Sequence, residues 1–247
     1  LQGALMQGGP KVDQLHFGGG TPTYLTPEQL GDVMRSLRSR FEFSRSIEGS
    51  IEIDPRTVDE PYIAALAQLG FNRMSLGVQD FDPDVQRAIN RIQSEEQTAT
   101  VMRSGRAHGF GSINVDLIYG LPKQTLDTVA RTLDRVIELG ADRIAFYNYA
   151  HLPALFKPQR RILDADLPSP DTKLQMLGEA IRRLTAAGYV HIGMDHFARP
   201  DDELAVAQRQ GRLHRNFQGY STHAECDLVG LGASAIGMLG PTFYQNQ

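Results

Sequence analysis

Single polar residues interrupt or end several apolar, strand-like runs of the chain. Glu52 lies in SIEID, Gln79 ends RMSLGVQ, and Asp116 interrupts INVDLIY. A charge buried in a sheet without a partner is costly, so such residues must be hydrogen-bonded or bound to a ligand. Since ligands of parallel α/β folds bind at the carboxyl ends of the strands, these residues predict a polar ligand site there.

A run of glycines marks a similar position nearer the start of the chain. In HFGGGTP, the glycines and Thr21 directly follow a short predicted strand, residues 15–17. Glycine weakens a strand, so three in succession indicate that the backbone passes close to another group, often a ligand. A tight turn without a ligand is the alternative. The motif is not G-x-G-x-x-G, so a Rossmann site is not expected.

The elements that must position these residues alternate along the chain. Apolar runs predict strands at 15–17, 50–54, 73–79, 113–119, 143–149 and 189–194. Periodic apolar residues predict helices from residue 26 and over 57–69, 94–108, 125–139 and 169–184. Alternation of this kind predicts a parallel sheet covered by helices, as a barrel, a partial barrel or a doubly wound sheet.

Local signals predict how some of these elements begin. Thr26 with Gln29, and Thr57 with Glu60, have the spacing of capping boxes at helix starts. Residues 1–13 are small and polar and predict the tail of a helix followed by a loop.

Composition limits the classes of protein and partner. The chain has 247 residues, of which 41% are hydrophobic and 22% charged, which suits one large domain or one and part of another. The net charge of -4 is spread over interspersed charges, so no nucleic-acid partner is expected. No apolar run approaches the roughly 18 residues of a membrane helix, so no membrane partner is expected either.

The chain's metal-binding residue types are few. The one cysteine, Cys226, excludes an internal disulfide framework and any site within the chain built on several thiolates. No pair of histidines has HExxH-type spacing, so we predict no metal ligand in the chain.

Five motifs together indicate a family. HFGGGTPTYL, IEIDPR, RMSLGVQDF, NVDLIYGLPKQT and YNYAHLP resemble, in this order, the radical S-adenosylmethionine (SAM) family of oxygen-independent coproporphyrinogen III oxidases. The haem chaperones of the same family share the barrel motifs. The segment GMDHFARPDDELAVAQRQGRLHRNFQGYSTH is similar to the oxidases rather than to the chaperones.

The resemblance implies a fold and an activity. It implies a partial (β/α)6 radical-SAM-type barrel with parallel strands over residues 1–186, with the first strand absent. Residues 187–247 would add strands and a helix and lead to a C-terminal domain that is also absent. The implied reaction is oxidative decarboxylation of two propionates of coproporphyrinogen III to vinyl groups, through a 5′-deoxyadenosyl radical, giving protoporphyrinogen IX. A cytoplasmic monomer served by a flavodoxin-type electron donor is implied as well.

The resemblance also implies cofactors, namely two SAM molecules and a [4Fe-4S] cluster. Residues matching contacts to the cluster-bound SAM are Gly19, Glu52 and Ile236. Residues matching contacts to the second SAM are Gly20, Thr21, Gln79, Arg91, Asp116 and Ala150. No residue is assigned as catalytic. The family's C-x3-C-x2-C motif is absent from this chain, so its cysteines are expected upstream of Leu1 and the chain alone is expected to be inactive.

Two other functions are compatible with these residues. The first is a non-enzymatic haem chaperone on the same radical SAM scaffold. The second is another α/β-barrel enzyme that uses the glycine-rich loop to bind a phosphate group.

Overall fold

The computed structural model describes residues 11–216 and 218–247. Between Arg199 and Pro200 the chain divides into two compact units. The predicted boundary after residue 186, between the radical SAM barrel and the added elements, stays a prediction. Of the helix tail and loop expected over residues 1–13, residues 1–10 lie outside the described residues, and the rest belong to the first strand.

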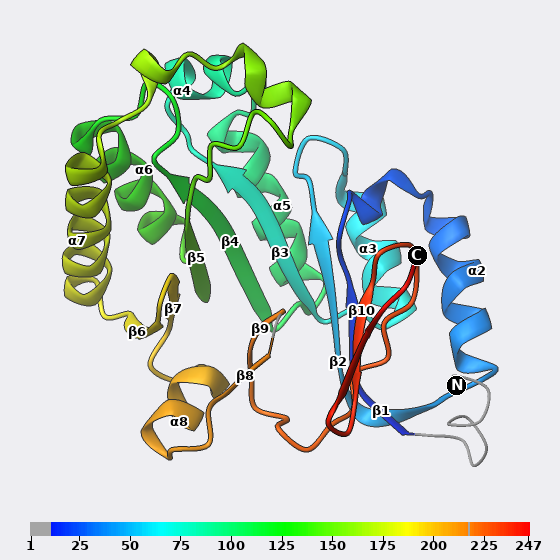
Figure 1. The fold of residues 1–247 in the computed structure, drawn as a ribbon. Helices are drawn as coiled ribbons and strands as arrows, with labels where there is room; N and C mark the ends of the chain where they lie inside the picture. Colours follow the sequence, from blue (N-terminus) through cyan, green and yellow to red (C-terminus); the bar gives the residue numbers. More distant parts are fainter. Residues whose placement is uncertain (1–10, 217) are drawn as a thin grey trace. The chain divides into compact units, whose positions relative to one another are not determined.

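The first unit is built on a seven-stranded sheet in the order β1-β2-β3-β4-β5-β7-β6 (Figure 1). The strands are β1 (Lys11–Phe17), β2 (Glu42–Ile53), β3 (Arg73–Gln79), β4 (Ser112–Tyr119), β5 (Arg143–Asn148), β6 (Val190–Gly193) and β7 (His196–Ala198). Strands β1 to β5 are parallel neighbours in chain order, as predicted.

The far edge of this sheet differs from the prediction of parallel strands throughout. β7 was not predicted, and it runs antiparallel to β5 on one side and to β6 on the other. Only Met194 and Asp195 separate β6 from β7. A link of that length closes a hairpin and cannot make the crossover that a parallel pair needs.

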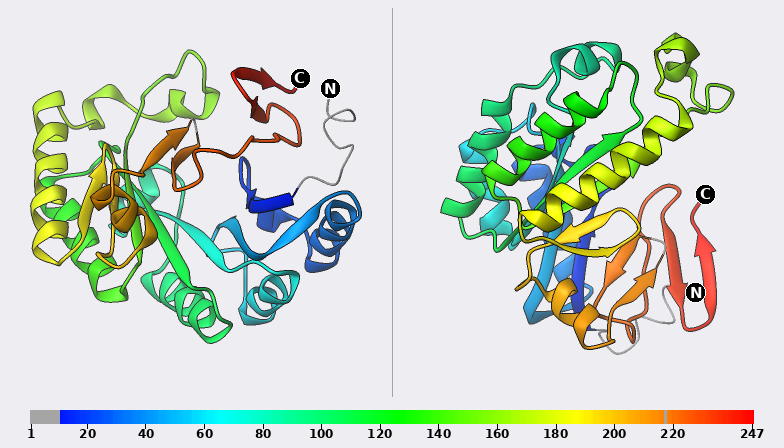
Figure 2. Two further views of the ribbon diagram at one scale, coloured as in Figure 1. Left: turned by 90° about the horizontal axis from the view of Figure 1, so that it is seen from below. Right: turned by 90° about the vertical axis from the view of Figure 1, so that its left-hand side faces the viewer.

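Helices connect the parallel strands and lie along one face of the sheet (Figures 1 and 2). The helices of the first unit are α2 (Pro27–Arg38), α3 (Glu60–Leu69), α4 (Pro83–Ala88), α5 (Glu95–Ala107), α6 (Leu126–Leu139) and α7 (Pro170–Ala186), with 3-10 helices at η1 (Pro22–Tyr24), η2 (Lys157–Arg161) and η3 (Asp164–Asp166). Between sheet and helices lies one hydrophobic core, which includes Ile51, Leu76, Val115 and Leu133.

Helix starts follow the local sequence closely. The capping box of Thr26 and Gln29 is present at α2. The box predicted for Thr57 and Glu60 is wrong, because the carboxylate of Asp59 caps α3 by accepting from the backbone N–H of Tyr62 at 2.9 Å. Aspartate is as good a cap as threonine, and here a proline, which suits the first helical turn, follows two residues later.

The second unit holds one helix and two hairpins. Its elements are α8 (Glu203–Arg209), β8 (His214–Asn216), β9 (Gly219–Ser221), β10 (Ile236–Leu239) and β11 (Thr242–Gln245). Strands β8 and β9, and strands β10 and β11, form two separate antiparallel pairs. Among the residues that the structure describes, no helix combines the length and the apolar character needed to cross a membrane.

Close packing of β2 against the end of α3 predicts a sensitive glycine. A Cβ on Gly49 would lie 2.7 Å from the carbonyl oxygen of Gly70, a backbone atom that cannot rotate away. We expect Gly49→Ala to lower the free energy of unfolding by about 1–3 kcal/mol. Gly178→Ala is the matched control in α7, where a Cβ meets nothing within 4 Å, and it should raise that free energy by about 0.5–1 kcal/mol. Urea denaturation checks both, and a Gly49→Ala variant as stable as the parent would contradict this packing.

Candidate ligand-binding site

The face of the sheet opposite the helices carries a band of polar side chains. They are His16 on β1, Glu52 on β2, Ser75 on β3, and Asn114 and Asp116 on β4. Side chains alternate along a strand, so the apolar neighbours of these residues point into the core instead. The parallel register pairs Glu52 with Ser75 and Ser75 with Asn114, which places the polar groups side by side.

Asp116 lies at the centre of this band. Ser75 Oγ donates to its Oδ2 at 2.6 Å, and Asn114 Nδ2 donates to its Oδ1 at 2.8 Å. Burial raises the pKa of Asp116 to about 6, and the neighbouring charge of Glu52 adds to this, while the two hydrogen bonds lower it. The pair of neutral donors therefore compensates the carboxylate only in part, and a cationic group beside it would be stabilised.

The glycine-rich turn after β1 packs against Glu52. The backbone N–H of Gly19 donates to Glu52 Oε2 at 3.3 Å, and His16 Nε2 lies 3.4 Å from Glu52 Oε1. A Cβ on Gly18 would lie 2.7 Å from Glu52 Oε1, and Gly19 has a φ of +100°, which glycine adopts without strain. The backbone of this motif was predicted to pass close to another group, and within the protein that group is Glu52. The Glu52 side chain remains 42% exposed.

A second polar cluster surrounds the end of β3. Arg91 Nη2 donates to the carbonyl oxygen of Gly77 at 2.6 Å, and its Nη1 lies 3.3 Å from Asp54 Oδ2. Asp54 also accepts from Arg56 at 2.6 Å. Burial acts to raise the pKa of Asp54, but the hydrogen bonds from Arg56 and the charges of Arg91 and Arg56 hold it below its ordinary value. Arg91 Nε is buried and has no hydrogen-bond partner among the described residues.

Gln79 joins this second cluster through an unusual backbone. Its φ is +68°, and the pairing of β3 with β4 shifts register between Gly77 and Gln79. A Cβ added to Gly77 would lie 3.1 Å from both Gln79 Nε2 and Arg91 Nη2. The structure therefore brings Gln79 and Arg91 together around one glycine.

Four other predicted residues lie apart from these contacts. Gly20 and Thr21 are exposed in the loop after β1. Ala150 is exposed after β5, and its carbonyl oxygen accepts from Gln159 Nε2 at 3.1 Å. Ile236 belongs to β10 in the second unit. Their assignment to a cofactor stays a prediction.

Sequence reasoning did not assign three members of the polar band, His16, Ser75 and Asn114. Asn114 could have been predicted to belong to the band, because it stands two residues before Asp116 on the same strand and therefore on the same face. Ser75 likewise stands between apolar residues of β3. Arg56 was missed as well, although it follows Asp54 by two residues and donates to it.

The chain is similar to a known family and to proteins of known name. The model of the radical SAM superfamily matches residues 4–136. Oxygen-independent coproporphyrinogen III oxidase of Pseudomonas aeruginosa is 58% identical over 237 residues, covering 95% of this chain and 52% of that protein. The protein of the same name from Escherichia coli is 56% identical over 239 residues, covering 97% of this chain and 52% of that protein. The chain thus spans about half the length of the curated relatives it matches.

A solved structure shares the fold. Coproporphyrinogen III oxidase (HemN) from Escherichia coli, described as a radical SAM enzyme, superposes with a TM-score of 0.94 at 56% identity. The match covers 96% of this chain and 55% of that one. It confirms the predicted fold, a partial radical-SAM-type barrel.

The raised pKa of Asp116 predicts how stability depends on pH. In the folded chain Asp116 holds its proton up to about pH 6, whereas the unfolded chain releases it near the ordinary value of 3.8. The stabilisation that comes from the protonated Asp116 is therefore fully present below pH 3.8. It is lost as the pH rises through about 6, so the free energy of unfolding falls over this range. In Asp116→Asn, the carbonyl oxygen of the new side chain can accept from Asn114, and its NH2 group can donate to Ser75. The amide does not titrate in this pH range.

We expect Asp116→Asn to gain stability relative to the parent as the pH rises from about 4 to 7, by about 2–3 kcal/mol. Urea denaturation of both proteins at the two pH values measures this difference. Parallel pH profiles for variant and parent would show that the pKa of Asp116 is not raised.

Proposed function

The chain belongs to the radical SAM superfamily, and we propose that it is part of an oxygen-independent coproporphyrinogen III oxidase. In the proposed reaction each of two propionate side chains of coproporphyrinogen III loses one hydrogen atom, one CO2 and one electron and becomes a vinyl group, giving protoporphyrinogen IX. The hydrogen atom would be taken up by the 5′-deoxyadenosyl group of SAM, and the electron by an external acceptor. Similarity to proteins named for this activity extends along nearly the whole chain and supports the proposal. The observation that carries it is the buried and incompletely compensated carboxylate of Asp116, with a second carboxylate, Glu52, beside it on the same face of the sheet.

The donor set of the site fits S-adenosylmethionine. This cofactor carries an ammonium group, a sulfonium, ribose hydroxyls and a carboxylate. The carboxylates of Glu52 and Asp116 can accept from the ammonium and the hydroxyls. The buried and unpartnered Nε of Arg91 is a donor suited to the carboxylate. When bound, SAM would supply the one-electron chemistry that removes a hydrogen atom from the substrate propionate, and Glu52, Asp116 and Arg91 would hold it in place.

We assign the predicted contact residues to two SAM molecules. The proposed contacts of the first molecule are Gly19, Glu52 and Ile236. The proposed contacts of the second molecule are Gly20, Thr21, Gln79, Arg91, Asp116 and Ala150. The hydrogen bond from Gly19 to Glu52 holds the glycine-rich turn against β2, which supports the assignment of both residues to one molecule.

The residues present do not fit a [4Fe-4S] cluster. Such clusters are held by several cysteine thiolates, and the chain contains only Cys226. We propose that the ligands of the cluster are supplied by sequence upstream of Leu1, and that this chain alone does not carry out the reaction. We further propose that the full-length protein is a cytoplasmic monomer that receives electrons from a flavodoxin-type donor.

Anaerobic turnover tests the proposed reaction directly. Full-length protein would be incubated with a reductant, SAM and coproporphyrinogen III. We expect two equivalents of CO2 and conversion of two propionates to vinyl groups for each porphyrinogen. Tight haem binding without either product would favour the chaperone, and binding of phosphate ligands unaffected by SAM would favour the other barrel enzyme. Either result would contradict the proposal.

The position of Arg91 predicts a selective effect on SAM binding. Loss of a hydrogen bond to a charged group costs about 1.5–3 kcal/mol, so Arg91→Ala should weaken the second SAM site by roughly 10–100-fold. The first site should change by less than about threefold, because additivity between separate sites holds within about 0.5 kcal/mol. Calorimetric titration of full-length protein with SAM measures both sites.

Arg87→Ala is the matched control for Arg91→Ala. Arg87 lies on α4, is exposed, and pairs only with Asp84 of the same helix among the contacts of the described residues. It should leave both SAM sites unchanged. Equal losses at both sites in Arg91→Ala, or no loss at all, would show that Arg91 does not serve the second site.

A further inference from the structure

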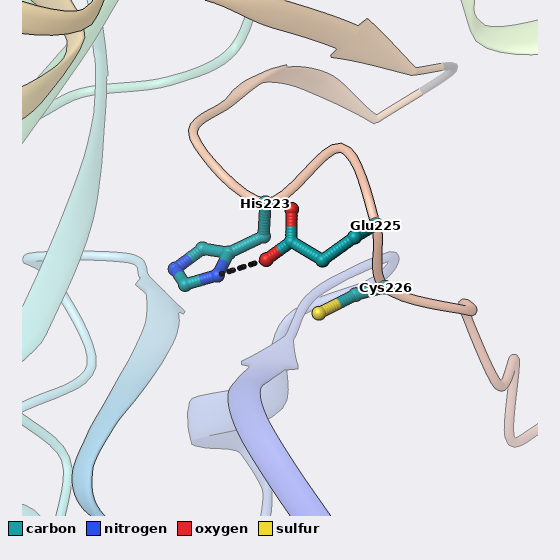
Figure 3. A group of neighbouring side chains, drawn as sticks. All are labelled: His223, Glu225 and Cys226. Atoms are coloured by element: carbon teal, nitrogen blue, oxygen red, sulfur yellow. Dashed lines mark ion pairs between the residues drawn. The ribbon is translucent and has the colours of Figure 1, made fainter. Parts of the chain in front are cut away.

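The loop between β9 and β10 brings an imidazole, a carboxylate and a thiol together. His223, Glu225 and Cys226 each offer one ligand atom, and these three atoms lie within 4.8 Å of one another. Figure 3 shows their side chains directed into a common space, with His223 Nδ1 at 3.6 Å from Glu225 Oε1. We propose that these residues bind a zinc-like divalent metal ion, in contrast to the sequence-based expectation of no metal ligand in this chain.

The three ligand types select a class of metal. Thiolate and imidazole prefer Zn²⁺, Co²⁺ or Cd²⁺, whereas Mg²⁺ and Ca²⁺ prefer sites made of oxygen atoms. Bonds of about 2.0–2.3 Å in a tetrahedral arrangement place neighbouring ligand atoms about 3.4–3.6 Å apart. The present spacing therefore closes around an ion by side-chain rotation of roughly an ångström, and the 75% exposed Glu225 is free of packing that would oppose it.

Charge favours a divalent ion at this place. With the thiol of Cys226 deprotonated and His223 neutral, as metal ligands must be, the three groups carry two negative charges. One divalent cation neutralises them. The contact of His223 with Glu225 alone adds little stability, because it lies at the surface.

The backbone on either side of the three residues is fixed. Before them, the N–H of His223 donates to Ser221 Oγ at 3.0 Å. After them, Asp227 Oδ1 accepts from the N–H of Gly240 at 2.7 Å, and Leu228 forms an antiparallel bridge with Met238. These contacts anchor the turn that carries the three ligands to β9 and to the β10–β11 hairpin. The backbone of the turn is therefore held in position before an ion binds.

Three protein ligands leave one tetrahedral position for water or an external ligand. Zinc sites that bind or activate small molecules have this arrangement, whereas structural zinc sites use four protein ligands. The proposed site is therefore accessible and exchangeable. It is independent of the proposed oxidase activity, since none of its residues was assigned to SAM or to the cluster.

Alkylation of Cys226, followed on its own peptide, tests the site separately from the cysteines proposed upstream of this chain. Full-length protein would be treated anaerobically with iodoacetamide, and modification would be followed on the peptide that contains Cys226. A metal-bound thiolate is a poor nucleophile, so micromolar Zn²⁺ should slow modification by roughly tenfold or more, whereas Mg²⁺ should not. The amount of zinc retained after dialysis should fall by one equivalent in Cys226→Ser.

Variants separate a three-ligand site from zinc bound to the thiol alone. Loss of an outer-shell partner already costs about 10–100-fold in metal affinity, so His223→Ala and Glu225→Gln should each raise the half-protecting zinc concentration by roughly tenfold or more. His214→Ala, a histidine of β8 in the same unit, should leave it unchanged. Glu225 is exposed, so its variant keeps the test valid if His223→Ala does not fold. Absence of protection by Zn²⁺, or protection equal in both ligand variants and the parent, would overturn the proposal.

Discussion

The first unit depends on a sheet that its own helices cover on one face only. Strands β2, β3 and β4 bury alternate side chains such as Ile51, Leu76 and Val115 against the helices, and this burial supplies the main stabilisation of the unit. Strands covered by helices on both faces read as continuous apolar runs. Here the second face is left to polar residues, and strand alternation in a parallel register gathers them into a band.

That band is stabilised only in part by the protein itself. Asp116 receives two neutral hydrogen bonds, yet burial still raises its pKa. Glu52 is contacted by a histidine and a glycine N–H. In the second polar cluster, Arg91 keeps a buried Nε without a partner among the described residues. Incomplete compensation of this kind is expected where a charged ligand completes the hydrogen bonding, and perturbed groups cluster at such sites. The arrangement suits a ligand that carries both a cationic group and a carboxylate.

Part of this could be predicted from the sequence because the signals are local. Glu52 and Asp116 interrupt apolar runs, and helix caps such as Thr26 act over three residues. The contact between Arg91 and Asp54 joins residues 37 positions apart, so no local pattern marks it. Strand β6 was predicted, but β7, its partner in the hairpin, was missed because its three residues are too few to show a period. The positive φ of Gln79 depends on a register shift between two strands, which exists only in the folded sheet.

A crystal structure of the full-length protein with SAM bound would test whether the polar band of the sheet binds S-adenosylmethionine, as proposed. We expect the ammonium or ribose groups of SAM to lie within hydrogen-bond distance of the Glu52 and Asp116 carboxylates, with Glu52 no longer paired with His16. SAM bound elsewhere, with the contact of 3.4 Å between His16 and Glu52 and the hydrogen bonds of Asp116 to Ser75 and Asn114 unchanged, would contradict it.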